Sequence, residues 1–349
     1  MILPISPAAT AAAPVPFVAA LRAGDYSRQN LRQALQCRGE TQQQLFALAR
    51  ERRRAAFPRE QVEARSVIEL SNVCQQACNY CSMAKGSDIK RYIIGLPEVL
   101  ELADHLYSCG RRVLLLQSGE NNSKNYLRFV TECVGGIKQK HPDLTIILCM
   151  GNYSREEYRQ LRDAGADRYI LKFETANPTL YARWKPSDTL AERLRCLELL
   201  LELGFQVGSG NMVGMPGQTL DDLVDDLLFF GRYPLAMMSC TVFIPGDHSN
   251  YRNEKMGDVE LALNSIALMR IMYPHLLMPT TSCLQQAKPD GQYWGLMAGA
   301  NTVTIHDGTP ARLKKLFPIY SSNRFTPNRE HFAQTLHRAR LTIAPGALI

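Results

Sequence analysis

The residues in this chain best suited to chemistry are three cysteines in one short run, SNVCQQACNYC. Cys74, Cys78 and Cys81 have the spacing C-x3-C-x2-C. Three thiolates this close in sequence can bind three irons of a cubic [4Fe-4S] cluster and leave the fourth iron without a protein ligand. An open iron can bind a small molecule and pass it one electron. The run therefore predicts a cluster that carries out one-electron chemistry on a bound partner.

Zinc is the main alternative for this run. Structural zinc takes four ligands, and its usual pattern joins one C-x2-C pair to a second pair or to His. No second C-x2-C pair follows in the chain. Chance clustering among the ten cysteines is the other alternative. We expect iron–sulfur binding, provided that the structural context supports it.

Size and composition agree with a soluble globular protein. The 349 residues suit one α/β barrel with extensions. Hydrophobic residues make up 46% and charged residues 21%, which is ordinary for a globular protein. No apolar run is as long as a membrane span, so no membrane association is expected. Ten cysteines without a signal-peptide pattern predict a reducing, cytoplasmic location.

The net charge of +7 is modest, but it is locally concentrated. The run RERRR, Arg50 to Arg54, is either a solvated helix face or a docking surface for an acidic protein. A smaller basic patch surrounds Lys314. No helix-turn-helix or RNA-binding motif is evident, so nucleic acid is not an expected partner.

The order of elements predicts an α/β protein with a (β/α)8 barrel of the TIM type. Residues 1–25, rich in Ala and Pro, are expected to be a flexible lead-in, and residues 26–60 an N-terminal helical segment. In residues 61–310, eight apolar strand runs alternate with amphipathic helices, which favours a parallel sheet that closes. Residues 311–349 are expected to form a C-terminal extension with one helix.

Chemistry in such barrels lies at the carboxyl ends of the strands. Thiols and polar residues gather at these ends in the predicted strands. The site is therefore expected at this end of the barrel. The residues are Cys74, Gln117 to Glu120, Cys149, Glu174, Cys240, Cys283 and His306.

Over residues 50–320 the chain resembles the radical S-adenosylmethionine (SAM) enzymes of the biotin-synthase-like subgroup. Within this subgroup it is most similar to the [FeFe]-hydrogenase maturases of the HydE type, and it is also similar to LipS-type two-component lipoyl synthases. In this family the open iron binds the amine and carboxylate of SAM, and reduction releases a 5′-deoxyadenosyl radical. The resemblance implies a [4Fe-4S] cluster, SAM and an electron donor such as ferredoxin or flavodoxin. The matching runs are IELSNVCQQACNYC, LLLQSGE, AGADRYILKFETANP, GFQVGSGNMVGMPGQT and FIPGDHSNYRNEKMGD.

The resemblance also implies roles for individual residues. Cys74, Cys78 and Cys81 would bind the cluster, and Tyr80 would lie near the adenine of SAM. The run Gln117, Ser118, Gly119 and Glu120 stands where the family usually has Gly-Gly-Glu, and it would hydrogen-bond the SAM amine.

Two charged residues complete the implied SAM site. Glu174 would approach the SAM amine or ribose, and Arg193 would pair with the SAM carboxylate, which suits a forked guanidinium. Other interpretations remain open. Glu120 could be an anion at a helix N-terminus, and Arg193 a surface helix residue. The glycines at 208–210 and 214–217 could serve turns and close packing instead of approach to the cofactor.

Three further cysteines suggest a second iron–sulfur cluster. Cys149, Cys240 and Cys283 fall near strand ends, although the maturase pattern does not require them. Cys149 resembles the strand-3 ligand of the auxiliary cluster in biotin synthase. Cysteine is also a common buried packing residue, so that alternative stands. Ser322 could be a further ligand, by resemblance to a serine of lipoyl synthases, or part of a polar turn.

The hypothesis favoured by the sequence is sulfur insertion into unactivated C–H bonds of an octanoyl chain, with the second cluster as sulfur donor. Its partners would be a second radical SAM protein and an acidic lipoyl carrier protein. One alternative is a HydE-like maturase, and another is a mutase similar to methylornithine synthase. A cluster-carrying scaffold without catalysis is a fourth possibility, but it would not need a SAM site.

Overall fold

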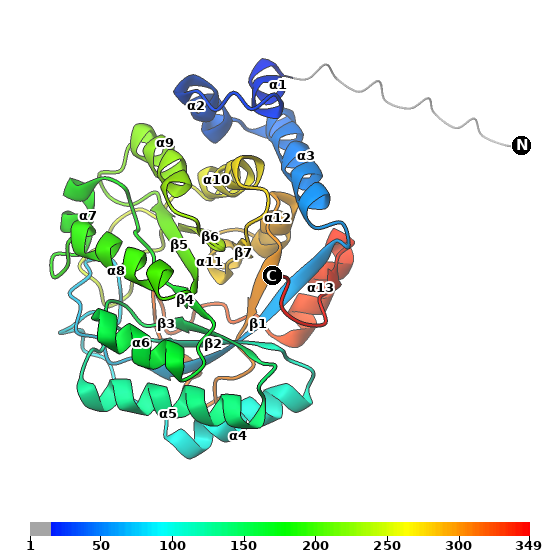
Figure 1. Cartoon of the computed structure of the whole chain (residues 1–349). Coiled ribbons are helices and arrows are strands. Elements are labelled where there is room, and N and C mark those ends of the chain that lie inside the picture. The colour runs from blue at the N-terminus through cyan, green and yellow to red at the C-terminus, as the bar shows by residue number, and fades with distance from the viewer. Residues whose placement is uncertain (1–14) are drawn as a thin grey trace, which may run out of the picture.

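The computed structural model describes residues 15–349 and shows a barrel of eight parallel strands surrounded by helices (Figure 1). The strands follow one another around the barrel in the order β6-β5-β4-β3-β2-β1-β8-β7. This confirms the predicted (β/α)8 architecture. The strands are β1 Gln61–Ser71, β2 Val113–Ser118, β3 Thr145–Cys149, β4 Arg168–Ile170, β5 Gln206–Val213, β6 Met237–Val242, β7 Pro279–Thr280 and β8 Thr302–Ile305.

The barrel closes between β6 and a very short β7. Leu277 forms a parallel bridge with Met237 just before β7. Its amide donates to Ala236 O at 3.0 Å and its carbonyl accepts from Met238 N at 2.9 Å. The strand β7 stays short because Ser282 already begins a helix.

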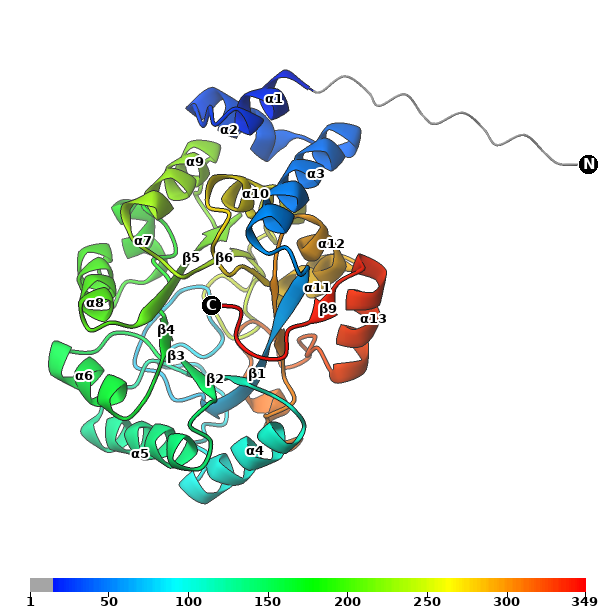
Figure 2. The same ribbon diagram turned by 45° about the vertical axis from the view of Figure 1, so that its right-hand side comes forward.

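Helices form the outer ring of the barrel (Figure 2). Two of them begin with reciprocal capping boxes, Ser154 with Glu157 and Thr219 with Asp222, which satisfy the first amides of the helix. No helix within residues 15–349 is long and apolar enough to cross a membrane. The ring consists of α4 Leu96–Ser108, α5 Lys124–Lys140, α6 Arg155–Asp163, α7 Pro178–Trp184, α8 Leu190–Glu202, α9 Leu220–Phe229, α10 Val259–Met272, α11 Ser282–Ala287 and α12 Gly291–Met297.

Alternate residues of each strand face the barrel interior and the helices. On β1, Val67 packs with the interior cluster, whereas Ile68 and Leu70 pack in the core between sheet and helices. The interior cluster of buried residues fills the middle of the barrel and consists of Val67, Val113, Leu115, Ile147, Met237 and Leu277.

The amino ends of the strands are closed by charged residues and by the end of the chain. Glu63 pairs with Arg65 at 2.8 Å and with Arg168 at 2.9 Å, and all three are buried. Leu348 packs against the interior cluster and donates its amide to Glu63. Figure 2 shows the C-terminus at the centre of this end. A last strand, β9 Thr342–Ile343, runs parallel to β1.

The N-terminal helices pack on one side of the barrel (Figure 1). They are α1 Pro16–Arg22, α2 Arg28–Gln36 and α3 Gly39–Ala56. The expected flexible lead-in of residues 1–25 is thus corrected for residues 16–22, where Phe17, Val18 and Leu21 are buried. Residues 1–14 of that lead-in lie outside the described part of the chain.

The basic run Arg50 to Arg54 attaches α3 to the barrel. Arg53 is buried and donates to Leu296 O at 2.7 Å, and Arg50 donates to Met297 O at 2.9 Å. These contacts reach carbonyls at the end of α12, which a cation near the helix C-terminus stabilises. Two of the arginines are therefore engaged within the molecule, which weakens the docking-surface interpretation.

The C-terminal extension returns to the carboxyl end of the barrel before its helix begins. It contains a short 3-10 turn, Lys314–Leu316, and α13 Arg329–Ala339. Asn72 Nδ2 donates to Leu316 O at 2.6 Å, and Ser82 N donates to Ile319 O at 3.0 Å. The extension therefore contacts the loop that follows β1.

Candidate active site

The loop between β1 and α4 carries the three closely spaced cysteines and is held by one arginine. Arg91 donates to the carbonyls of Asn72, Met83, Ala84 and Ser87, at distances from 2.7 to 3.3 Å. A single planar guanidinium thus fixes four points of the loop without contacting a thiol. We call residues 72–94 the cluster loop.

Burial keeps the thiols of the cluster loop protonated when they are alone. It raises the pKa of Cys78 to about 12, and it also raises the pKa values of Cys74 and Cys81. Thiols in such surroundings lose their protons when a metal takes the charge. No group of three His, Cys, Asp or Glu within residues 15–349 is close enough to bind a single ion. A cubic cluster needs a wider set, because each thiolate binds its own iron.

The carboxyl end of β2 packs directly against the cluster loop. A Cβ at Gly119 would collide with Val73 O and with Cys74 Cβ, so only glycine fits there. Gln75 N donates to Glu120 O at 2.8 Å. Ser118 is buried and donates to Gly119 O, and Gln117 is half-buried. The predicted run 117–120 therefore lies beside the cysteines.

Glu120 is the centre of a buried ion network. Its Oε1 lies 2.7 Å from Arg193 Nη2 and 3.2 Å from Lys185 Nζ. Burial alone would raise the pKa of Glu120, but Arg193 and Lys185 outweigh it and lower that pKa to about 2. The interpretation of Glu120 as a helix-terminal anion is wrong, because Ser123 caps α5.

Arg193 comes from α8 and reaches inward to this network. It is 2% exposed, which excludes the surface-helix interpretation. Its Nη2 lies 2.9 Å from Asp188 Oδ2, and its Nε donates to Tyr181 OH at 3.0 Å. Lys185, Asp188 and Tyr181 were not predicted. They follow the ETANP run, but neither spacing nor periodicity distinguishes them from surface residues there.

Glu174 and Tyr80 meet at 3.3 Å, where the Tyr80 hydroxyl donates to Glu174 Oε1. Lys172 Nζ lies 2.9 Å from the other carboxylate oxygen. Glu174 has a φ of +62°, a left-handed conformation that is uncommon for residues other than glycine. The turn brings its buried side chain towards the cluster loop. Two predicted residues from distant parts of the chain are thus in contact.

The residues present fit a [4Fe-4S] cluster with a bound amine beside it. Glu120 Oε2 is buried and has no hydrogen-bond partner within residues 15–349. A buried carboxylate oxygen in this condition requires a donor, and the amine of SAM is a donor. The structure therefore suits the predicted role of Glu120, whereas Arg193 contacts acidic groups of the protein itself.

The glycines of β5 serve packing between neighbouring elements. A Cβ at Gly208 would meet Met237 Cε at 2.9 Å, and one at Gly210 would collide with Ser239. Gly214 has a φ of +82° and packs against Gly257. The structure thus favours the close-packing interpretation over direct approach to a cofactor.

The three cysteines expected to hold a second cluster are not brought together. Cys240 lies on β6 between Ser239 and Thr241, whose side chains face the barrel interior. The side chain of Cys240 therefore points to the opposite side of the strand, towards the helices. It is fully buried in the core between sheet and helices. Strand alternation therefore excludes Cys240 from a cluster inside the barrel, which corrects that expectation.

Cys149 and Cys283 occupy different positions. Cys149 ends β3 and packs against the interior cluster. Cys283 lies in the first turn of α11 instead of on a strand. Burial raises their pKa values to about 12 and about 11, while Lys172 acts in the opposite direction on both. The two thiols therefore lack the predicted third partner.

Ser322 lies in a turn of the C-terminal extension. The neighbouring Ser321 accepts a hydrogen bond from Asn323 N at 3.1 Å, as expected for a polar turn. The proposed role of Ser322 as a cluster ligand stays a prediction.

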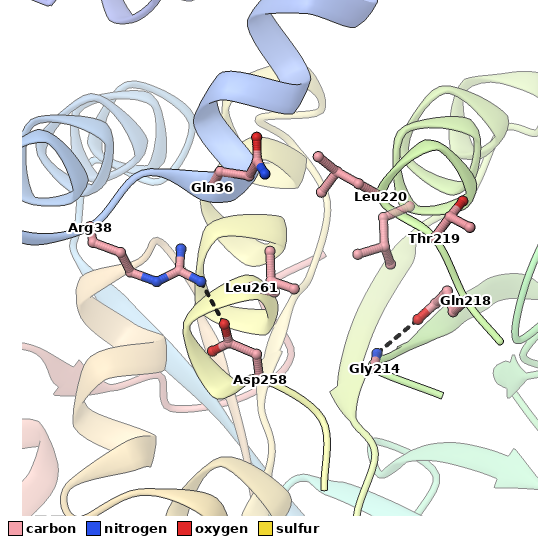
Figure 3. Close-up of a pocket in the computed structure, with 9 residues that line it drawn as sticks. Gln36, Arg38, Gly214, Gln218, Thr219, Leu220, Asp258 and Leu261 are labelled. Carbon is pink, nitrogen blue, oxygen red and sulfur yellow. Dashed lines mark hydrogen bonds and ion pairs between the residues drawn. The ribbon is translucent and has the colours of Figure 1, made fainter. Parts of the chain in front are cut away.

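A separate groove of about 510 Å³ lies between the N-terminal helices and the barrel (Figure 3). Arg38 pairs with Asp258 at 2.6 Å on one wall, and Gln218 Oε1 accepts from Gly214 N at 2.7 Å on the other. The groove shares no residue with the cluster loop or with the Glu120 network.

Comparison with known proteins identifies the family. Residues 68–230 match the radical SAM superfamily. HydE, a [FeFe] hydrogenase maturase subunit of Thermotoga maritima, is 37% identical over 299 residues, or 85% of this chain and 84% of HydE. Biotin synthase of Pseudomonas aeruginosa is 26% identical over 72% of each chain. The fold matches methylornithine synthase with a TM-score of 0.83 at 22% identity, covering 94% of this chain and 97% of the other. The chain therefore belongs to the radical SAM superfamily, in the group of HydE and biotin synthase, and uses a [4Fe-4S] cluster with SAM.

Proposed function

We propose that this protein is a HydE-like maturase-type enzyme that acts on a small polar molecule inside its barrel. The cluster and SAM, when bound, supply a 5′-deoxyadenosyl radical after one-electron reduction by a donor such as ferredoxin or flavodoxin. Cys74, Cys78 and Cys81 would hold the cluster. Glu120 would accept a hydrogen bond from the SAM amine, and Tyr80 and Glu174 would border the same site.

The observation that carries this proposal is the 37% identity with HydE over 84% of its length. A relationship of this extent includes both the barrel and the flanking segments. The fold match with methylornithine synthase, at 22% identity, supports the barrel alone and not a shared substrate.

The polarity of the barrel interior also favours a small polar substrate. Ser239 and Thr241 face the interior and are half-buried, whereas Met238, Cys240 and Val242 between and beside them are buried. Lys172 approaches Thr241 Oγ1 at 3.5 Å. Ser239, Thr241 and Lys172 therefore make part of the wall at this end of the barrel polar, beside the half-buried Cys149 and Ile170. A polar substrate could hydrogen-bond this part of the wall, whereas an octanoyl chain could not.

Sulfur insertion loses its structural support for a second reason. The expected auxiliary cluster required Cys240, which faces the helices instead of the interior. An enzyme of the LipS type is therefore not proposed, and neither is an acidic lipoyl carrier as partner.

The test is in vitro assembly of [FeFe]-hydrogenase with the other maturation factors present and HydE omitted. Addition of this protein, reconstituted anaerobically, is expected to restore hydrogen evolution, and its Cys78→Ala variant is expected not to. If the protein cleaves SAM but never restores hydrogenase activity, it is a radical SAM enzyme of another specificity. A parallel reaction with an octanoylated carrier protein is expected to yield no lipoyl product.

A further inference from the structure

A second polar cluster lies at the same end of the barrel and takes no part in the SAM site. Glu69 lies two positions after Val67 on β1, so its side chain points to the same side of the strand, the barrel interior. His306 follows β8, the strand that pairs with β1, and Arg324 comes from the C-terminal extension. Figure 1 shows β1 as a long strand in the wall of the barrel. Three separate parts of the chain therefore meet inside the barrel.

The contacts of Glu69 are concentrated on one of its two carboxylate oxygens. His306 Nδ1 lies 3.1 Å from Oε1, and Arg324 Nη2 contacts the same oxygen. Arg324 Nε also donates to Phe317 O at 2.9 Å, which fixes the guanidinium. An imidazole that donates from Nδ1 to a carboxylate leaves Nε2 as an acceptor.

The other oxygen of Glu69 requires a donor. Glu69 is fully buried, and its Oε2 has no hydrogen-bond partner within residues 15–349. Thr281 Oγ1, just after β7, is also buried without a hydrogen-bond partner within residues 15–349. Nearly all buried polar atoms in folded proteins are satisfied by protein, water or ligand, so an unsatisfied carboxylate oxygen marks a place for a donor.

The chemistry of these atoms indicates the kind of ligand. A carboxylate oxygen can only accept hydrogen bonds, and an imidazole Nε2 in this tautomer also accepts. Because Arg324 already offsets the charge on Glu69 through Oε1, the unpartnered Oε2 suits an amino group, which brings several N–H donors to one point. A carboxylate or phosphate ligand would instead be repelled by Oε2.

We propose that Glu69 and His306 bind the amino group of a small primary-amine substrate in the barrel, next to the SAM site. Arg324 positions the carboxylate of Glu69. This inference rests on the proposed function, since it names the chemical class of the molecule that the radical would meet. Binding of the amine at β1 and β8 would fix the substrate on a rigid part of the barrel.

The experiment measures the rate of 5′-deoxyadenosine formation by the cluster-loaded protein with SAM and dithionite. The probes are glycine, L-alanine, L-serine and L-lysine, each compared with its N-acetyl counterpart. At least one free amine is expected to raise the rate in a saturable way, and its acetylated form is expected not to, since acetylation removes the ammonium group. Equal stimulation by both forms, or no stimulation by any free amine, overturns the inference.

The variant that tests the residue assignment is Glu69→Gln. Glutamine keeps one oxygen for His306 and Arg324 but turns the other acceptor into an N–H donor. The concentration of amine for half-maximal stimulation is expected to rise about 10- to 100-fold, the range for a lost hydrogen bond to a charged group. His306→Gln is expected to shift it in the same direction.

The matched control is Glu63→Gln at the opposite end of the barrel. Glu63 is equally buried and also pairs with an arginine, Arg168 at 2.9 Å. The control is expected to need the same amine concentration for half-maximal stimulation as the wild-type protein. An equal rise in this concentration in both variants overturns the inference. If Glu69→Gln fails to fold, the comparison of free and N-acetylated amines with the wild-type protein still tests whether the barrel binds an amino group. Absence of 5′-deoxyadenosine formation in every reaction would instead contradict radical chemistry itself, and with it both proposals.

Discussion

At the scale of single residues, the proposed SAM site depends on the different surroundings of the two carboxylate oxygens of Glu120. Oε1 receives Arg193 and Lys185, while Oε2 is buried without a partner in the described chain. The network also includes Asp188, which pairs with Arg193. Buried charges of this kind are tolerated only when they are paired. The two cations therefore hold Glu120 ionised and leave one oxygen for a ligand.

Glu120→Gln is expected to weaken SAM binding about 10- to 100-fold, because it removes a charged acceptor from the amine. Cluster content should stay unchanged, since the cysteines are not altered. Anaerobic equilibrium titration of SAM measures the effect. Glu156→Gln, in an exposed pair with Arg159 on α6, is the control. Equal dissociation constants in the two variants would show that Glu120 does not contact SAM.

At the scale of elements, α9 holds the turn that presents Glu174. Asp226, fully buried on α9, accepts from Ala176 N at 2.7 Å and from Thr175 Oγ1 at 3.1 Å. It also accepts from Asn211 Nδ2 at 3.1 Å. One carboxylate thus ties the left-handed turn after β4 to β5 and to a helix. Asp226 acts on the site through Glu174 and is a positioning residue.

Asp226→Leu is expected to raise the KM for SAM about tenfold, because the turn loses two hydrogen bonds and β5 loses a third. Asp226→Asn should behave nearly like wild type. The amide oxygen of the new asparagine still accepts from Ala176 N and Thr175 Oγ1. Its amide nitrogen can donate to Asn211 Oδ1 once the Asn211 amide flips, since that oxygen has no partner within residues 15–349. Steady-state 5′-deoxyadenosine formation measures KM and kcat. Asp225→Asn, at the exposed neighbour that pairs with Arg28, is the control. A leucine variant with the KM of that control would refute the positioning role.

The same residue gives a pH dependence of stability. Burial raises the pKa of Asp226 from 3.8 to about 7 and outweighs its three donors. The folded state therefore binds this proton more tightly than the unfolded state does. Ionised Asp226 lowers the free energy of unfolding above pH 7, and this cost disappears as the pH falls towards 4.

Asp226→Asn removes the titrating group and tests this directly. The variant is expected to be more stable than wild type at about pH 8, and the difference should shrink by about pH 5. Urea unfolding under anaerobic conditions at both pH values measures it. A difference that does not change with pH would mean that Asp226 is already ionised in the folded protein at both values.

At the scale of the whole molecule, the two ends of the barrel are built differently. The carboxyl end carries the cluster loop, the Glu120 network and half-buried polar residues of the interior. The amino end is closed by Glu63, Arg65, Arg168 and the residues around Leu348. The closed amino end would therefore keep water from reaching the proposed site from that side.

Closure of the amino end predicts a stability effect far from the site. Leu348→Ala is expected to lower the free energy of unfolding by about 1–2 kcal/mol, less than a fully buried leucine, because Leu348 is only half-buried against the interior cluster. Ile343→Ala, at a 46% exposed position, should change it by less than about 0.5 kcal/mol. Urea unfolding compares the two. Similar effects of both variants would show that Leu348 does not contribute to the closure.

Much of the fold and part of the site could be predicted from the sequence. Eight apolar runs of strand length between amphipathic helices favour a closed parallel barrel. The three cysteines follow the first of these runs, which places the cluster loop after the first strand. The family resemblance places both Tyr80 and Glu174 near SAM, and the structure brings them into contact. Strand alternation could also have placed Cys240 outside, since Ser239 and Thr241 beside it are polar and face the interior.

Other features depend on tertiary contacts that leave no local signal. Lys185 and Asp188 look like surface charges in sequence, yet the packing of α7 and α8 buries them. Glu69 and Arg324 are 255 positions apart and meet only because the extension returns to the barrel. Arg53 belongs to a run that resembles a solvated helix face, but the carbonyls that it reaches lie 243 and 247 positions away.

The most direct test of the account is reductive cleavage of SAM by the anaerobically reconstituted protein with dithionite. The account predicts formation of 5′-deoxyadenosine and methionine, retained in Cys240→Ala and abolished in Cys78→Ala. Intact SAM after incubation with protein shown to carry about four irons per chain would contradict an open iron that binds and cleaves it.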